Sequence, residues 1–428
     1  METRTDDVFV TPEQLCIGLY VHIDLPWFSH PFSFSSFRIK SADQISTLRG
    51  LGVKQFRVDP SRSDKMPEAT TGATEAAAAP AAETAPLSPA EAERVQRTRL
   101  LAERKEKLAH MEKAFAKAAT IMRNINRNLL SNPRDCLQEV GGLVDQMVGA
   151  FLNEPEIALH VMGEKAGGEE VYFHGLNVAI LSMMLAREMG MTAEDTRVLG
   201  LGAMFHDIGL MEIPDKVLKK NIDEMNHAER ELRKLHNDYG LKIAKRVGLP
   251  ESVQAIIAQH HENADGSGYP KGLKGEAIAQ PARIVAMVNH YDNLCNPADI
   301  SRALTPHEAL SLMFSQRRAK FDAQALQLMI RCLGVYPPGS VVKLSNESIA
   351  LVQSVNPAKP LRPWVLLYDA KVPKEEAISI NLEDDPSLNI VKAVRPIQLP
   401  TAVFEYLNPR KRVTYYFDAN SSNPAKGQ

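Results

Sequence analysis

The segment from Pro67 to Pro89 divides this chain of 428 residues into parts that must fold separately. It reads PEATTGATEAAAAPAAETAPLSP, with many small residues and prolines and no aromatic side chain. Because this composition cannot bury enough apolar surface to offset the conformational entropy lost on folding, we expect a flexible linker over residues 61–90. The remaining chain is long enough for two or three domains with their own cores.

The residues before the linker predict a small α/β domain over residues 1–60. Apolar and polar residues alternate as in a strand in LCIGLYVHID and again in KQFRVD. Between these stretches, SADQISTLRGLG begins with a serine suited to a helix N-cap and ends at a glycine, which commonly stops a helix.

A seven-residue repeat of apolar side chains predicts a long helix over residues 91–132. The a positions are Leu101, Leu108, Phe115, Met122 and Leu129, and the intervening d positions are Met111, Ala118 and Ile125. Two interpretations fit this pattern. Either the helix forms a parallel coiled coil and a homodimer, despite Arg104 at a d position, or it is a single amphipathic helix that packs on its own domain.

The pattern changes from helical to strand-like near residue 335. Residues 133–335 are predicted to be helical throughout, and the apolar run Val178–Ala186 is about half a membrane span, which favours a buried core helix. In residues 336–428, the segments SVVKLS, IALVQSV, RPWVLLYD and RVTYYFD predict a small β extension. The expected protein is multidomain, with an α/β domain, a coiled-coil-like helix, an all-α domain and a β extension.

Composition argues against several functional classes. Lys and Arg (50 residues) nearly balance Asp and Glu (52 residues), which gives no electrostatic reason to expect DNA or a membrane surface as a partner. The N-terminus lacks the charged-then-apolar order of a signal peptide. Four widely spaced cysteines predict neither a zinc knuckle nor a disulfide framework. We therefore expect a cytoplasmic protein with reduced thiols.

Histidines and carboxylates gather in four short motifs of the helical region. The residues concerned are Glu170, His174, His206, Asp207, His236, His260 and His261. Burying so many imidazoles and carboxylates without partners would be costly, and metal coordination removes that cost. Nitrogen and oxygen donors suit Fe, Mn, Zn or Ni, and a carboxylate beside a histidine can bridge two cations that act on a phosphoester. His110 and His227 are expected to be solvated.

Two motifs together carry a family resemblance. HD at the end of an apolar helix, followed by HHENADGSGYP, resembles the HD-GYP branch of the HD phosphohydrolase superfamily, and the similarity extends from Pro133 to Gly334. The resemblance implies an all-helical domain that hydrolyses cyclic di-GMP to the linear dinucleotide or on to GMP. It also implies two or three divalent transition-metal ions, Fe or Mn in the first place and Zn or Ni as alternatives.

The same resemblance implies roles for individual residues. His206 and Asp207 would be catalytic, and the metal ligands would be Glu170, His174, His206, Asp207, His236, His260, His261 and Asn289. Gly268, Tyr269 and Pro270 match the signature loop, which would contact the substrate or cyclic di-GMP-synthesising partner proteins. In the flanks, residues 18–59 resemble the uncharacterised domain often found ahead of HD-GYP domains, and LGVYPPGSVVKLSN resembles the β extension that often follows them.

Two positions depart from the family pattern. Leu210 stands where the family has a lysine that meets a substrate phosphate, and the candidates to replace that lysine are Lys216, Lys271, Lys274 and Arg283, of which Lys271 and Arg283 are predicted to bind substrate. Asn289 stands where the family has an aspartate, and its uncharged amide should bind the cation more weakly. Asp292 matches the family's second aspartate and is an alternative ligand.

Three functional hypotheses follow. The first is an active cyclic di-GMP phosphodiesterase. The second is a module that binds the dinucleotide or a partner protein without turnover, which Leu210 and Asn289 favour. The third is an HD hydrolase of another nucleotide, such as a cyclic mononucleotide or an alarmone, against which the GYP loop argues.

Overall fold

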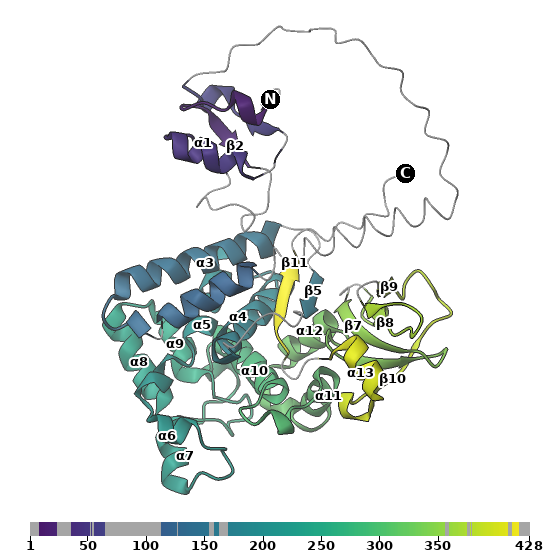
Figure 1. Ribbon diagram of the computed structural model, residues 1–428. Helices are drawn as coiled ribbons and strands as arrows, with labels where there is room; N and C mark the ends of the chain where they lie inside the picture. Colours follow the sequence, from purple (N-terminus) through teal and green to yellow (C-terminus); the bar gives the residue numbers. More distant parts are fainter. Residues whose placement is uncertain are drawn as a thin grey trace. The chain divides into compact units, whose positions relative to one another are not determined.

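The computed structural model describes 12 stretches of the chain, and all structural statements below refer to them. They are residues 8–23, 36–51, 53, 55–64, 113–125, 127–153, 158–161, 170–355, 359–374, 377, 379–409 and 413–418. The chain forms two compact units, which divide between Ala114 and Phe115 and which we describe one at a time (Figure 1). Most of the predicted linker lies outside the described residues.

In residues 8–64, as far as the structure describes them, the N-terminal unit has a four-stranded antiparallel sheet and helix α1. The strands lie in the order β1-β4-β2-β3, and their bounds are β1 (Val8–Val10), β2 (Tyr20–His22), β3 (Ser36–Arg38) and β4 (Phe56–Val58). Helix α1 (Ala42–Arg49) begins where Ser41 accepts a hydrogen bond from the Gln44 backbone, as predicted. The α/β prediction is therefore confirmed for β2, α1 and β4, whereas β1 and β3 were not predicted.

The second unit is built mainly of helices. Residues 113–125 are helical, and the helices that follow are α3 (Pro133–Asn153), α4 (Glu170–Glu188), α5 (Ala193–Phe205), α6 (Asp215–Leu218), α7 (His227–Lys234), α8 (His236–Val247), α9 (Glu251–Gln259), α10 (Gln280–Cys295), α11 (Pro306–Gln316) and α12 (Ala323–Leu333). Helix α4 packs against α3, α5, α10 and α12. The run Val178–Ala186 within it is buried, which confirms the predicted core helix. No described helix has the length and apolarity needed to cross a membrane.

The second half of the heptad repeat is buried inside this unit. Phe115, Met122 and Leu129 are each at most 7% exposed, and the rings of Phe115 and Phe173 are 4.9 Å apart. These side chains behave as the single-helix interpretation predicts, because they pack on the chain's own helices. The earlier heptads, with Leu101 and Leu108, lie outside the described residues, so the coiled coil stays a prediction.

A seven-stranded sheet joins the two ends of the second unit. Its strands are β5 (Ala158–Val161), β6 (Val341–Leu344), β7 (Ile349–Val355), β8 (Trp364–Leu367), β9 (Ser379–Asn381), β10 (Ile390–Val394) and β11 (Tyr415–Asp418), and a further helix is α13 (Thr401–Leu407). The four predicted strand segments contain β6, β7, β8 and β11, whereas β9, β10 and α13 were missed. The prediction that residues 133–335 are helical throughout was wrong at β5.

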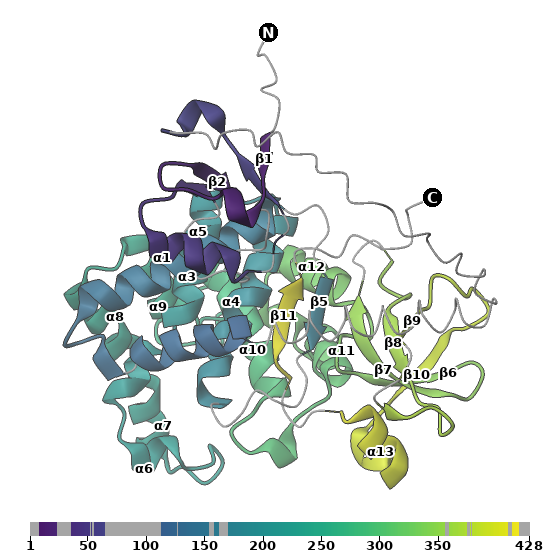
Figure 2. The same cartoon turned by 45° about the horizontal axis from the view of Figure 1, so that its top comes forward.

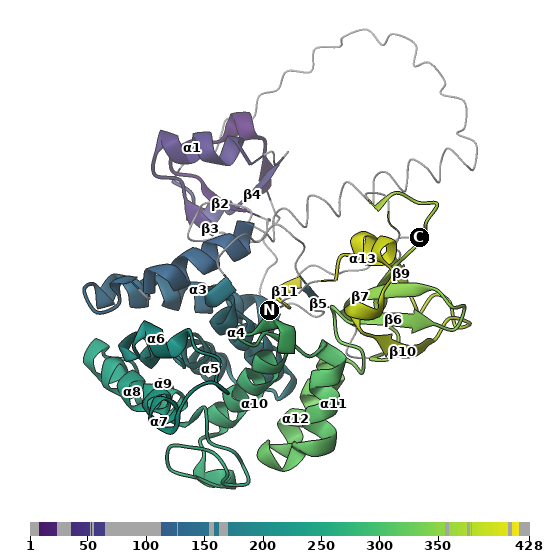
Figure 3. The same cartoon turned by 60° about the horizontal axis from the view of Figure 1, so that its bottom comes forward.

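Strands β5 and β11 lie side by side between the helices and the other strands (Figures 1 and 2). They pair antiparallel with Tyr415 opposite Val161, and β5 also pairs with β7. The remaining strands and α13 gather beyond α11 and α12 (Figure 3). The end of the chain therefore returns to the helical part instead of staying with the strands that precede it.

Candidate metal centre

The carboxylate of Asp207 lies between two groups of histidines that come from different helices. Asp207 follows α5 and the adjacent His206. Its Oδ2 lies 3.5 Å from His206 Nε2 and 3.8 Å from His174 Nε2. Its Oδ1 lies 3.3 Å from His236 Nε2 and 3.5 Å from His260 Nε2. Each carboxylate oxygen therefore faces its own pair of imidazole nitrogens.

The spacing of these atoms fits two cations that share Asp207. The first group is His174 with His206, and the second group is His236 with His260 and His261. In each group the ligand atoms, together with one of Asp207, lie within 4.8 Å of one another. The Nε2 atoms of His174 and His206 are 3.2 Å apart, and those of His236 and His260 are also 3.2 Å apart. Two nitrogens bound tetrahedrally at about 2.0–2.1 Å from one ion would be separated by roughly 3.3 Å.

Hydrogen bonds at Nδ1 decide which imidazole nitrogen faces the centre. In His206, His236 and His260, Nδ1 lies 2.7, 2.7 and 2.9 Å from the backbone carbonyl three residues earlier. A carbonyl can only accept, so each Nδ1 carries the proton and each Nε2 presents a lone pair. Two lone pairs 3.2 Å apart cannot bond to each other, but a cation between them satisfies both. The residues present therefore fit a pair of metal ions.

Two glycines allow the helices to approach closely enough for this arrangement. A Cβ atom on Gly209 would lie 1.9 Å from the backbone oxygen of His236, which no relaxed structure allows. A Cβ atom on Gly240 would lie 2.8 Å from a methyl group of Ile257. Glycine at these positions lets α8 pack directly on the segment after Asp207 and on α9. The glycine two residues after Asp207 is therefore part of the metal centre's construction.

Three family models match the chain. A model described as "HD domain" matches residues 152–325, which contain the whole centre. The model "Domain of unknown function (DUF3391)" matches residues 9–136, and "KOW domain associated with HD domain" matches residues 341–402. The chain is an HD-domain protein of the HD-GYP type.

Relatives of this HD-GYP protein have names that describe phosphodiesterases. "Cyclic di-GMP phosphodiesterase PA4108" of Pseudomonas aeruginosa is 27% identical over 96% of this chain and 98% of its own length. "Cyclic di-GMP phosphodiesterase response regulator RpfG" of Xanthomonas campestris is 36% identical over 35% of this chain and 39% of its own length. "3'3'-cGAMP-specific phosphodiesterase 1" of Vibrio cholerae is 29% identical over 42% of each chain.

The GYP loop, residues 263–273, is held against the second group by Glu262. Glu262 is 2% exposed, and its two carboxylate oxygens accept hydrogen bonds from the backbones of Lys271 (2.7 Å) and Leu273 (2.9 Å). The ring of Tyr269 stacks on His261 with centroids 4.6 Å apart. No role was predicted for Glu262, although its place directly after His260 and His261 was a signal. Its role is to fasten the loop to the ligands.

Burial and charge shift the pKa values of the ligands. Burial lowers the pKa of His206 to about 3, and it also lowers the pKa values of His260 and His261. Burial acts in the same direction on His174, but the hydrogen bond and charge of Asp292 outweigh it and raise the pKa of that imidazole. The pKa of Asp207 lies well below its usual value, because the surrounding histidines outweigh the effect of its burial. The centre is thus built to keep His206, His260 and His261 neutral and Asp207 ionised.

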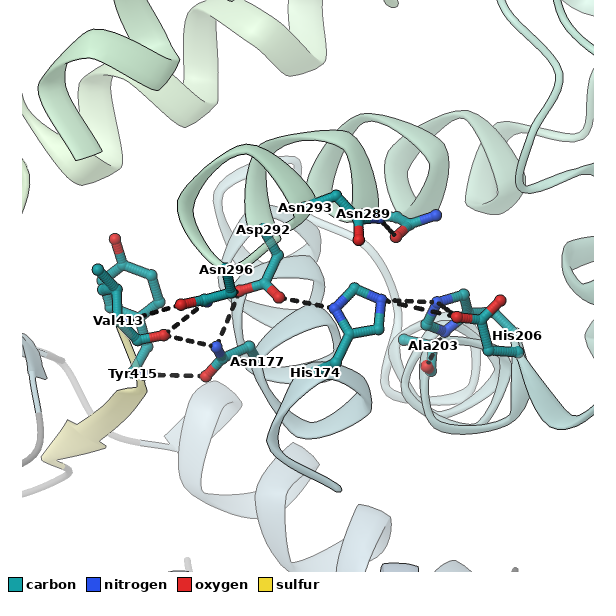
Figure 4. Close-up of polar contacts among 11 residues, drawn as sticks. His174, Asn177, Ala203, His206, Asn289, Asp292, Asn293, Asn296, Val413 and Tyr415 are labelled. Atoms are coloured by element: carbon teal, nitrogen blue, oxygen red, sulfur yellow. Dashed lines mark hydrogen bonds and ion pairs between the residues drawn. The ribbon is translucent and has the colours of Figure 1, made fainter. Parts of the chain in front are cut away.

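Asn289 and Asp292, both on α10, lie on different sides of His174 (Figure 4). Asn289 is 3% exposed. Burial has the largest effect on the pKa of His174 and lowers it, whereas a hydrogen bond with Asn289 acts with Asp292 to raise it. Its Oδ1 accepts a hydrogen bond of 2.5 Å from Asn293. Asp292 is fully buried, and its Oδ2 lies 2.6 Å from His174 Nδ1, the nitrogen that faces away from Asp207. Asp292 therefore contacts His174 from the side opposite Asp207.

The candidate phosphate-binding residues occupy varied positions. Leu210 packs in a small apolar cluster with Ile213 and Val217, so it is a packing residue here. Arg283 forms an ion pair of 2.8 Å with Asp322. The side chains of Lys216, Lys271 and Lys274 are exposed. None of these observations tests substrate binding, so Lys271 and Arg283 remain predictions.

Three further residues complete the description of the site. The side chain of Glu170 lies outside the described residues, so its predicted role as a ligand stays a prediction. His227 is 89% exposed, as predicted for a solvated histidine. His110 lies outside the described residues.

Proposed function

We propose that this protein is a metal-dependent phosphodiesterase that hydrolyses cyclic di-GMP. The observation that carries the proposal is the carboxylate of Asp207, whose two oxygens face two different groups of histidines at 3.3–3.8 Å. Paired cations held in this way would supply the Lewis acidity and the activated water that phosphodiester hydrolysis requires. The names of the relatives, which specify cyclic dinucleotides, support the substrate class.

The chain's own residues prepare this chemistry. Asp207 supplies negative charge between the two cation positions, and the low pKa of its carboxyl keeps it ionised at neutral pH. Because Nδ1 of His206, His236 and His260 carries the proton, the Nε2 lone pairs face the centre, and no proton has to leave these imidazoles when metal binds. Nitrogen and oxygen donors suit Fe, Mn, Zn or Ni, of which the family resemblance implies Fe or Mn in the first place, and elemental analysis of the purified protein tests this assignment.

Arg233 is our candidate for a cation that binds a substrate phosphate. It lies at the end of α7, three residues before His236, whose Nδ1 donates to the Arg233 backbone carbonyl. Burial and the charge of Asp207 raise the pKa of Tyr269 in the GYP loop, and the charge of Arg233 opposes them. Among the residues that the structure describes, no carboxylate pairs with the half-buried Arg233. An unpaired guanidinium beside the centre suits an anionic ligand.

The decisive experiment is incubation of the metal-loaded protein with cyclic di-GMP, followed by chromatography of the products. We expect the linear dinucleotide or GMP from the native protein and neither from Asp207→Ala. Binding of cyclic di-GMP without turnover would instead support a degenerate module, which the neutral Asn289 and the apolar Leu210 favour. A parallel incubation with 3'3'-cGAMP measures the preference between the two dinucleotides, since one relative is specific for the latter.

We also propose that the chain is a homodimer through the first heptads of the repeat. Because Phe115, Met122 and Leu129 are buried in their own unit, we assign the dimer contact to the part of the repeat from Leu101 to Met111. Light scattering should give a dimer at micromolar concentration that Leu101→Asp with Leu108→Asp converts to a monomer, since charged residues at a positions disrupt the seam. A monomeric native protein would contradict this proposal.

A further inference from the structure

The last described segment of the chain packs beside the metal centre. Val413, Thr414 and Tyr415 are 6%, 3% and 0% exposed, and β11 continues from them alongside β5 (Figure 2). This segment lies beyond residues 341–402, which match the KOW model. None of its side chains is a ligand of the centre, so its burial there has no explanation in the proposed chemistry.

Two asparagines bind the backbone of this segment. Asn296, directly after α10, accepts from the Val413 amide (2.7 Å) and donates to the Val413 carbonyl (2.8 Å). Asn177, on α4, donates to the same carbonyl (2.9 Å) and accepts from the Tyr415 amide (3.0 Å). The segment therefore occupies the donor and the acceptor of both side-chain amides, and this fixes which way each amide is turned.

The same two asparagines hold Asp292 (Figure 4). Asp292 Oδ1 accepts from Asn177 Nδ2 at 2.8 Å and from Asn296 Nδ2 at 2.9 Å. Its other oxygen, Oδ2, lies 2.6 Å from His174 Nδ1. A continuous series of hydrogen bonds thus leads from the backbone of residues 413–415, through the asparagines and Asp292, to a ligand of the first group.

We propose that the C-terminal segment, residues 413–415, is a positioning element of the metal centre that acts on the first group alone. With this segment in place, each asparagine turns its NH₂ group toward Asp292. Without the segment, either amide could flip and present its oxygen to the buried carboxylate of Asp292. The two oxygens would then repel each other. Asp292 would then lose the orientation that holds His174, and the cation at His174 and His206 would bind more weakly.

The second group lacks any such dependence on a distant segment. His236 and His260 donate Nδ1–H to carbonyls of Arg233 and Ile257, three residues earlier in the chain. Each contact joins residues three positions apart in the chain, so it does not depend on residues 413–415. The proposal therefore predicts a selective effect on one of two cations, which general destabilisation of the fold does not produce.

The test is a titration of the metal-free full-length protein with Mn²⁺, and it rests on the metal centre of the proposed function. Asn296→Ala removes one link, and a chain that ends at Pro409 removes the segment. We expect both variants to weaken one cation about tenfold or more, which is usual for residues that orient ligands, and to change the other less than about twofold. In ¹⁵N-histidine NMR spectra of the metal-free protein, His174 should lose its fixed Nδ1–H tautomer.

Two matched controls separate this role from a structural one. Tyr291→Phe removes the 2.7 Å hydroxyl contact between Tyr291 of α10 and Tyr415, but leaves the asparagines intact, so both affinities should stay native. A chain that ends at Asp418 keeps the segment and should also behave as native. Native affinities and a native His174 tautomer in Asn296→Ala, or equal weakening of both cations, would overturn the proposal.

The outcome is independent of catalysis. If the selective loss occurs and cyclic di-GMP is not hydrolysed, the proposed function fails and the positioning role stands. If the native protein hydrolyses cyclic di-GMP and Asn296→Ala retains both cations, the positioning role fails alone. If no Mn²⁺ binds to the native protein, the NMR spectrum of His174 in the metal-free variants still tests whether residues 413–415 position this imidazole.

Discussion

The two groups of histidines share one carboxylate but are oriented in different ways. In the second group, the Nδ1 atoms of His236 and His260 donate to carbonyls three residues earlier in the chain. In the first group, His174 depends on Asp292, which lies 118 positions later in the sequence. The difference teaches that His206, His236 and His260 are oriented locally, whereas the orientation of His174 forms only when α4, α10 and the end of the chain have assembled.

Asp207 belongs to both halves, so its removal should have the largest effect. We expect Asp207→Ala to lower both metal affinities and to reduce hydrolysis of cyclic di-GMP by about a thousandfold or more, because both groups lose their shared anion. Circular dichroism should show an unchanged helix content, since Asp207 makes no helix-capping hydrogen bond. Elemental analysis and chromatography check the prediction. Native turnover in this variant would remove Asp207 from the mechanism.

Ligand variants in each half should divide the effect. His174→Ala should remove about one metal equivalent and leave the second group's cation in place, while His260→Ala with His261→Ala should do the reverse. His227→Ala is the matched control, because His227 is exposed and belongs to neither group of histidines. Metal content after dialysis measures all three variants. If either set of changes removes both cations together, the halves are not independent and the comparison above fails.

Much of the site could be predicted from the sequence because its ligands stand in short motifs. His206 beside Asp207, and His260 beside His261, are adjacent residues at helix ends, so a local pattern identifies them. The role of Asp292 could not be read in this way, because it depends on contacts with His174 and with asparagines on two elements. Strand β5 was missed for the same reason, since only its pairing with β7 and β11 makes it a strand.

The two imidazoles of the first group should also respond differently to pH in the metal-free protein. The folded pKa of His206 is about 3, below its unfolded value near 6.5, so its contribution to stability is present above pH 6.5 and is lost as the pH falls toward 3. The folded pKa of His174 is raised, so its contribution is complete below pH 6.5 and is lost as the pH rises through the folded pKa.

Urea unfolding between pH 5 and pH 8 measures these contributions. Because His206, His260 and His261 all have lowered pKa values and only His174 has a raised one, the free energy of unfolding should fall on acidification below about pH 6.5. His206→Gln should flatten this decrease, and His174→Gln should make it steeper. A decrease of equal slope in both variants would show that the two imidazoles do not differ as described.

The smallest expected effect concerns Asn289, where the first group lacks a charge. Asn289→Asp should tighten the cation at His174 and His206 by about tenfold and raise turnover, because a carboxylate beside His174 adds one negative charge to a group in which Asp207 is the one carboxylate among the described ligand atoms. Its Oδ1 can still accept from Asn293, which leaves the second oxygen for the metal. The competing idea is that Asp292 already supplies this charge as a ligand. Its bond to Nδ1 of His174, the nitrogen that faces away from Asp207, argues against that idea.

Asn289→Ala is the matched variant, because it removes the amide oxygen without adding charge and should weaken the same cation. Asp292→Asn should weaken that cation as well, through loss of the His174 orientation, and Mn²⁺ titration of all three variants gives the order. If Asn289→Asp changes neither affinity nor rate while Asp292→Asn abolishes binding, Asp292 is a ligand and the helix must rotate when metal binds. If none of the three changes metal binding, α10 takes no part in the centre. Any difference in metal affinity between the two groups must then come from the histidines themselves.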